Sequence, residues 1–105
     1  MTHKFKGMNT KLIHAGEPRP LIEGAVSLPI FQSSTFEYSG EESEQARYIR
    51  LNNTPNHSAL HEKLAVIEGG EAALVTASGM AAISTALLAV LKPGDRVLVQ
   101  SDLYG

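Results

Sequence analysis

AALVTASGMAAISTALLAVL, residues 72–91, is the stretch that decides the fold of this 105-residue chain. Its apolar, partly β-branched beginning at 73–77 predicts a buried strand. Ser78-Gly79-Met80 interrupts the pattern, and residues 81–91 are rich in alanine and leucine, which favours a helix. A Lys-Pro-Gly-Asp turn ends this helix, and 96–100 is a second predicted strand. The order strand, helix, strand predicts an α/β fold with a parallel sheet and a right-handed crossover.

Ser78-Gly79-Met80 lies where the first predicted strand meets the helix. The first N–H groups of a helix have no partner within it, and the helix dipole adds about half a positive charge there. Gly79 has no side chain, so a bulky anion can approach the backbone, and Ser78 can cap the helix or contact the anion. We interpret this turn as a phosphate cradle. The alternative is that Ser78 is only an N-cap and Gly79 only fits a tight turn.

Composition and charge exclude several classes of function. The net charge is −2 and there is no basic block, which argues against nucleic-acid binding. No cysteine is present, which excludes disulfides and thiolate metal sites and fits a cytoplasmic protein. No apolar run reaches the roughly 18 residues of a membrane span. His57 and His61 lie four residues apart, but with no evident third ligand we expect a solvated helix face and no metal site.

Residues 1–54 are expected to form an extended arm, because glycine and proline interrupt 1–47 and make helix unlikely over most of it. The segment 27–36 has the pattern of extended chain, and its apolar side chains have no local core to enter. We therefore expect the arm to pack on another part of the protein or on another subunit, the alternative being a disordered leader. The acidic residues at 41–44 predict a solvated turn or a first helical turn.

Tyr48 and Arg50 are two residues apart, so in extended chain their side chains point to one side. A phenol and a planar fork of guanidinium donors suit a phosphate, although such a pair is also common as a solvated surface feature. A helix is predicted to begin next, with Thr54 as N-cap and Pro55 as its first residue. The glycine pair at 69–70 is expected to end it.

Six motifs follow one another along the chain: TKLIHAG at 10–16, PIFQSSTF at 29–36, YIR at 48–50, LAVIEGG at 64–70, SGMAA at 78–82 and DLYG at 102–105. Taken together, these motifs resemble the amino-terminal part of the pyridoxal-phosphate-dependent enzymes of Cys/Met metabolism. The order and spacing of the motifs make the resemblance specific, and it covers nearly all of the chain from Thr10. The run Asn52-Asn53-Thr54-Pro55-Asn56-His57 departs from the shorter Gly-Asn-Pro-Thr run of many members, which affects the expected loop geometry.

The resemblance implies a type I fold, with 1–54 as an arm contacting a neighbouring subunit and 55–105 as the start of the large cofactor-binding domain. It implies pyridoxal 5′-phosphate as cofactor. The resemblance assigns its phosphate to the turn of Ser78, Gly79 and Met80, and the neighbouring subunit's phosphate to Tyr48 and Arg50. Tyr104 is expected to stack on the pyridine ring and act as a catalytic proton donor. Dimers paired into tetramers are the expected assembly.

The implied activity is β- or γ-elimination or replacement on a sulfur amino acid: cysteine, cystathionine, methionine or activated homoserine. The family's Schiff-base lysine and ring-nitrogen carboxylate lie later than residue 105, and none of the chain's five lysines matches the lysine motif. We therefore expect an amino-terminal fragment of a larger enzyme that is inactive alone. The alternative is a non-catalytic fragment or a phosphate-binding α/β module that only docks on related subunits.

Overall fold

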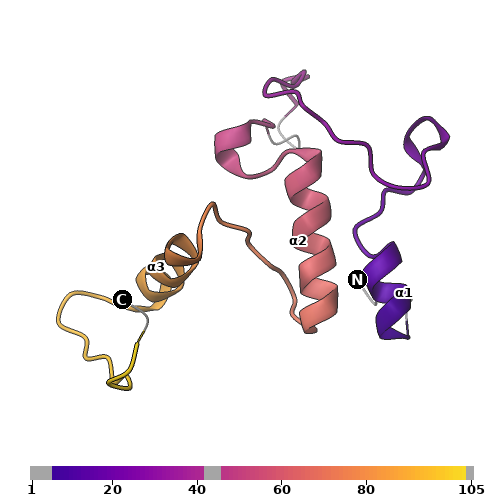
Figure 1. Cartoon of the computed structure of the whole chain (residues 1–105). Helices are drawn as coiled ribbons and strands as arrows, with labels where there is room; N and C mark the ends of the chain where they lie inside the picture. Colours follow the sequence, from indigo (N-terminus) through magenta and orange to yellow (C-terminus); the bar gives the residue numbers. More distant parts are fainter. Residues whose placement is uncertain (1–5, 42–45, 104–105) are drawn as a thin grey trace. The chain divides into compact units, whose positions relative to one another are not determined.

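The computed structural model describes residues 6–41 and 46–103, which form a helical structure in two compact units, Met1–Val75 and Thr76–Gly105 (Figure 1). The acidic residues at 42–44 lie outside the described part. The described elements are the α-helices α1 (Met8–His14), α2 (Pro55–Glu68) and α3 (Gly79–Val90) and the 3-10 turns η1 (Ile22–Gly24) and η2 (Ile49–Leu51).

Helix α2 has the bounds that its end signals predict. Thr54 is the N-cap, with extended backbone, and Pro55 is the first helical residue. The Thr54 side chain is buried, and its hydroxyl is hydrogen-bonded to Nδ1 of His57 at 2.7 Å instead of capping a backbone N–H. At the other end Gly69 adopts the left-handed conformation, φ 69°, that a glycine allows at little cost. Both predicted boundaries are confirmed.

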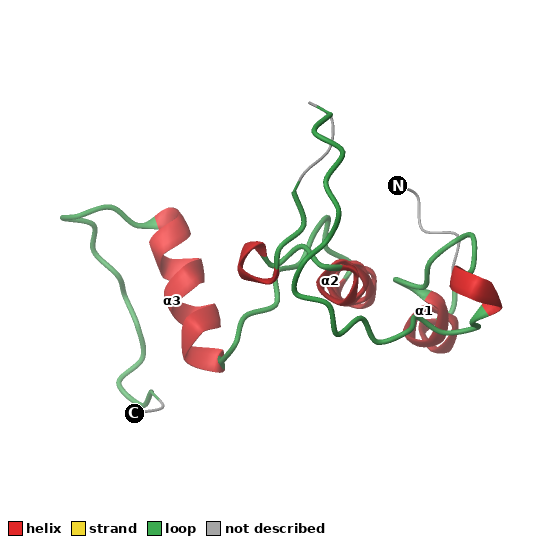
Figure 2. Ribbon diagram, turned by 90° about the horizontal axis from the view of Figure 1, so that it is seen from above, coloured by secondary structure: helices red, strands yellow, loops and turns green. Residues whose placement is uncertain are grey.

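Helix α1, which the breaker-rich sequence did not predict, packs against α2 (Figure 2). The small core of this unit consists of Ala15, Ala65 and Val66. Gly16 follows the helix with φ +75°, and an added Cβ would lie 2.2 Å from the carbonyl oxygen of Ala59. Only a residue without a side chain lets the two backbones approach so closely, so tertiary packing holds this short helix in place.

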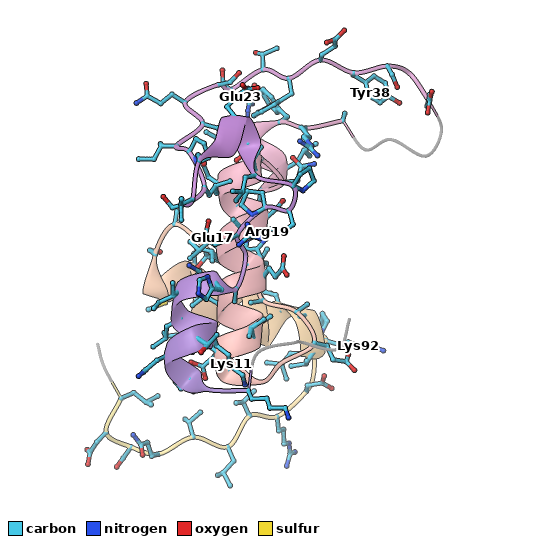
Figure 3. The ribbon with its side chains drawn as sticks, turned by 90° about the vertical axis from the view of Figure 1, so that its right-hand side faces the viewer. Lys11, Glu17, Arg19, Glu23, Tyr38 and Lys92 are labelled. Atoms are coloured by element: carbon cyan, nitrogen blue, oxygen red, sulfur yellow. The ribbon has the colours of Figure 1, made fainter. Side chains whose placement is uncertain are left out.

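The chain after α1 is tied to α2 by polar side chains. Glu17, which lies alongside α2 in Figure 3, accepts a hydrogen bond from the Leu28 N–H at 2.7 Å and pairs with Lys63 at 3.5 Å. Asn56 holds Phe31 by both backbone groups, accepting from its N–H at 3.1 Å and donating to its carbonyl at 2.7 Å. The arm therefore packs on another part of its own chain, and its contact with a neighbouring subunit stays a prediction.

The predicted strands at 73–77 and 96–100 are not paired as strands in the described structure, so the sheet of the expected strand–helix–strand unit stays a prediction. A strand is defined by backbone hydrogen bonds to a neighbouring segment. Neither segment has such a partner among the described residues, where the single β-bridge joins Thr35 to Tyr48. Most of their large apolar side chains are correspondingly exposed, namely Leu74, Val97, Leu98 and Val99, and Leu98 is 99% exposed.

His57 and His61 do not lie on the solvated helix face that was expected, because both are half-buried. Their ring centroids are 6.2 Å apart, and Nε2 of His61 is buried without a hydrogen-bond partner in the described part of the chain. Burial lowers the pKa of His61 below 6.5, and the neighbouring His57 lowers it further. Among the described residues no third potential ligand joins the pair in a metal-binding cluster.

No described helix is long and apolar enough to span a membrane.

We predict that Gly16→Ala destabilises the chain more than Gly24→Ala does. Both glycines have positive φ, +75° and +77°, so both variants pay the left-handed strain of about 1–2 kcal/mol. An added Cβ at Gly24 meets no atom within 4 Å, whereas at Gly16 it collides with a carbonyl of α2. Gly16→Ala should lose a further 1–3 kcal/mol or so of unfolding free energy in denaturant titrations. Equal losses would contradict the close α1–α2 approach.

We also predict that stability falls as the pH drops below about 6.5. The folded state holds His61 with a lowered pKa, so the unfolded chain takes up a proton first as the pH falls. The contribution of His61 is complete above pH 6.5 and is lost below it, towards the folded-state pKa. Unfolding free energies measured from about pH 7 to pH 5 should decline less steeply in His61→Gln than in the unsubstituted chain. Equal slopes would show that His61 stays solvated.

Candidate phosphate site

Ser78 caps helix α3, which begins two residues earlier than the composition predicted. Its backbone is extended, φ −157° and ψ 160°, and its hydroxyl oxygen accepts a hydrogen bond from the Ala81 N–H at 3.1 Å. Its carbonyl accepts the first intrahelical bond, from the Ala82 N–H at 3.0 Å, and a further bond from the Thr76 hydroxyl at 2.9 Å. The N-cap role is therefore present, whatever else the turn binds.

The Ser78 cap provides an acceptor for only some of the free backbone N–H groups in the first turn of α3. The N–H groups of Gly79 and Met80 have no acceptor among the described residues. Both residues are exposed, and the positive end of the dipole of a 12-residue helix lies at the same place. Two adjacent free donors at the start of a helix are suited to bind an anion.

Gly79 is not required by the turn itself. Its φ lies outside the left-handed region, and an added Cβ would meet no atom within 4 Å. The alternative in which glycine serves only to fit a tight turn therefore has no support in the described geometry. The open space beside its backbone is what an approaching phosphate needs.

Tyr48 and Arg50 come together, although not through the extended backbone that was predicted. Residues Ile49–Leu51 form the 3-10 turn η2, so the extended conformation is wrong beyond Tyr48. The Arg50 Nη2 nevertheless donates to the Tyr48 hydroxyl oxygen at 2.8 Å, and its Cζ lies 5.2 Å from the centre of the phenol ring. Both side chains are exposed. Because the phenol oxygen accepts this bond, its own proton is available to an anion, as are the other guanidinium N–H groups.

The predicted site residues fall into two groups that belong to different compact units. Tyr48 and Arg50 belong to the unit Met1–Val75, and the Ser78-Gly79-Met80 turn belongs to the unit Thr76–Gly105. Tyr104, the predicted ring-stacking and proton-donating residue, lies outside the described residues. Its role stays a prediction.

Two asparagines, noted in the sequence only as part of a departure from the family pattern, shape the Tyr48–Arg50 turn. Asn53 accepts from the Tyr48 N–H at 3.0 Å and donates to the Ala46 carbonyl at 2.9 Å. Asn52 has φ 55° and donates to the Val75 carbonyl at 2.8 Å. The signal that could have revealed them is a pair of adjacent asparagines just before a helix, since asparagine both tolerates the left-handed conformation and bonds nearby backbone.

Comparison with known proteins identifies what this chain is similar to. An L-methionine γ-lyase of Fusobacterium nucleatum subsp. polymorphum is 44% identical over 114 residues, covering 100% of this chain and 28% of the relative. A cystathionine γ-synthase of Mycobacterium leprae is 43% identical, covering 98% and 27%. A cystathionine β-lyase of Bacillus subtilis is 44% identical, covering 93% and 25%. The chain thus spans about a quarter of the length of these curated relatives.

The model of one protein family matches residues 9–105 of the chain, under the description Cys/Met metabolism PLP-dependent enzyme. That match takes in both groups of candidate phosphate donors and the segment that ends at Gly105. The motifs that carried the resemblance in the sequence lie within the same range. The chain belongs to the pyridoxal-phosphate-dependent enzymes of Cys/Met metabolism, and its cofactor is pyridoxal 5′-phosphate.

Proposed function

We propose that this chain supplies the phosphate contacts of a pyridoxal-phosphate enzyme that eliminates or replaces the sulfur-bearing group of an amino acid. The observation that carries the proposal is the pair of unsatisfied N–H groups at Gly79 and Met80, beside open space at the start of α3. These donors fit the dianionic phosphate of the cofactor. When bound, pyridoxal phosphate supplies the electron sink for the chemistry, and the protein binds and orients it.

Each candidate residue has a defined task in this proposal. Gly79 and Met80 donate their backbone N–H groups to the phosphate, and Ser78 holds the first turn of α3 so that they point outward. Tyr48 and Arg50 donate to the phosphate bound by a neighbouring subunit, within a dimer that pairs into a tetramer. Tyr104 covers one ring face and transfers a proton as the catalytic residue of this segment.

The proposal extends to the fold and to the rest of the enzyme. Residues 73–77 and 96–100 would become parallel strands of a type I sheet once paired, which their uncovered apolar side chains favour. Residues 1–54 would be the intersubunit arm and 55–105 the start of the large domain. The substrate class is the sulfur amino acids named in the relatives, the reaction is a lyase or transferase reaction, and the expected compartment is the cytoplasm.

Gly79→Pro tests the cradle in a complete enzyme that carries this sequence. Gly79 is the first residue of α3, a position where proline suits the helix, and Ser78 before it already has the extended backbone that proline demands. The variant should therefore fold and lose only one donor. We expect its dissociation constant for pyridoxal phosphate to rise about 10-fold or more, since a hydrogen bond to a charged group is worth about 1.5–3 kcal/mol.

Gly79→Ala is the matched control, because it adds a Cβ and keeps the N–H. An added Cβ has no atom of the described residues within 4 Å, so a loss of affinity in this variant measures crowding of the ligand. Cofactor affinity is followed by fluorescence titration, and the fold by thermal melting of the apo form. A Gly79→Pro protein that melts normally and binds the cofactor as tightly as the unsubstituted enzyme would refute the proposed phosphate contacts and favour a segment that only docks on related subunits.

A further inference from the structure

We propose that Asn53 is a positioning residue for the phosphate donors Tyr48 and Arg50, an inference that rests on the proposed function. The Asn53 side-chain amide forms two hydrogen bonds with the backbone of the loop 46–53. Oδ1 accepts the Tyr48 N–H at 3.0 Å, and Nδ2 donates to the Ala46 carbonyl at 2.9 Å. One side chain thereby fixes the backbone on both sides of Arg47, immediately before the tyrosine that presents its phenol.

This pair of bonds matters because little else holds the Tyr48 backbone. The Tyr48 carbonyl accepts a hydrogen bond from the Leu51 N–H at 2.9 Å, and an isolated β-bridge joins Tyr48 to Thr35. Tyr48 is 38% exposed, so packing covers the residue only in part. The hydrogen bonds of the loop, of which Asn53 makes two, therefore contribute to the direction of the phenol.

The Tyr48–Arg50 contact makes this backbone restraint relevant to phosphate binding. The Arg50 guanidinium donates to the Tyr48 hydroxyl at 2.8 Å and lies over its ring, so the two side chains form one group of donors before a ligand arrives. Side chains that are ordered in advance lose less conformational freedom on binding, which raises affinity. A loosened Tyr48 backbone would make the pair less ordered without removing a donor.

Asn52 restrains the other side of η2. It adopts φ 55°, a left-handed conformation that asparagine accepts more readily than most residues, and its Nδ2 donates to the Val75 carbonyl at 2.8 Å. The adjacent asparagines thus bond η2 to the loop before it and to a segment more than twenty residues later. They lie in the run 52–57, where this chain departs from the shorter run of many family members.

Comparing two ligands distinguishes positioning from general stability. Pyridoxal lacks the phosphate of pyridoxal phosphate. The dissociation constant of pyridoxal divided by that of pyridoxal phosphate therefore isolates the phosphate contacts, and this ratio falls when those contacts weaken. In the complete enzyme, Asn53→Ala should weaken pyridoxal phosphate binding by roughly 3- to 10-fold, the range that neutral hydrogen bonds provide, and leave pyridoxal binding unchanged. If Asn53 had only a structural role, its substitution would raise both dissociation constants by the same factor, and that result would overturn the inference.

Asn56→Ala is the matched control. Asn56 makes the same kind of two-bond contact, with the backbone of Phe31 at 3.1 and 2.7 Å, but has no hydrogen bond to Tyr48 or Arg50. Its removal should leave the ratio of dissociation constants unchanged, and a fall equal to that of Asn53→Ala would overturn a specific role for Asn53.

Arg50→Ala separates the two proposals. If it leaves the ratio unchanged, the proposed phosphate contact itself fails; if it alone lowers the ratio, only the role of Asn53 fails.

A second measurement needs no substitution and therefore does not depend on the folding of Asn53→Ala. The Tyr48 amide proton bonds to Asn53, so its exchange with solvent in the unsubstituted enzyme should be at least about 10-fold slower than in an unstructured chain. Binding of pyridoxal phosphate should slow this exchange further. Exchange at the unstructured rate, with and without the cofactor, would overturn the inference.

Discussion

The first turn of a helix leaves backbone N–H groups without intrahelical acceptors, and the site proposed here depends on how α3 meets that constraint. Ser78 satisfies the N–H of Ala81 and starts the helix by accepting from Ala82. Nothing described satisfies Gly79 and Met80. The same serine that stabilises the helix therefore leaves two donors facing outward, so the N-cap role and the phosphate role are compatible.

The donors of the other unit are organised by a different means. Its buried core is small, namely Ala15, Ala65 and Val66, and hydrogen bonds from side chains to backbone give the arm and η2 their shape. Glu17 and Asn56 hold the arm on α2, and Asn53 holds the loop that presents Tyr48. Such bonds act over short distances, so a single substitution can redirect a functional side chain while the helices persist.

The sequence predicted those elements whose signals are local. Thr54 and Pro55 marked the start of α2, the Gly69-Gly70 pair marked its end, and Ser78 marked the cap of α3. Features that depend on distant partners were missed or stay unconfirmed. Helix α1 needs α2 to pack on, and the segments 73–77 and 96–100 need neighbouring strands that the described residues do not provide. Within the site, Tyr48 and Arg50 were expected to point to one side of an extended chain, whereas the 3-10 turn η2 brings the two side chains into contact.

A structure of the complete enzyme with pyridoxal phosphate bound tests the central claim most directly, through the distances from the phosphate oxygens to the backbone nitrogens of Gly79 and Met80. The account predicts that both distances fall within hydrogen-bonding range, about 2.7–3.2 Å. It also predicts that Ser78 still caps Ala81 in that complex. A phosphate bound elsewhere, with both N–H groups facing solvent or another protein group, would contradict it.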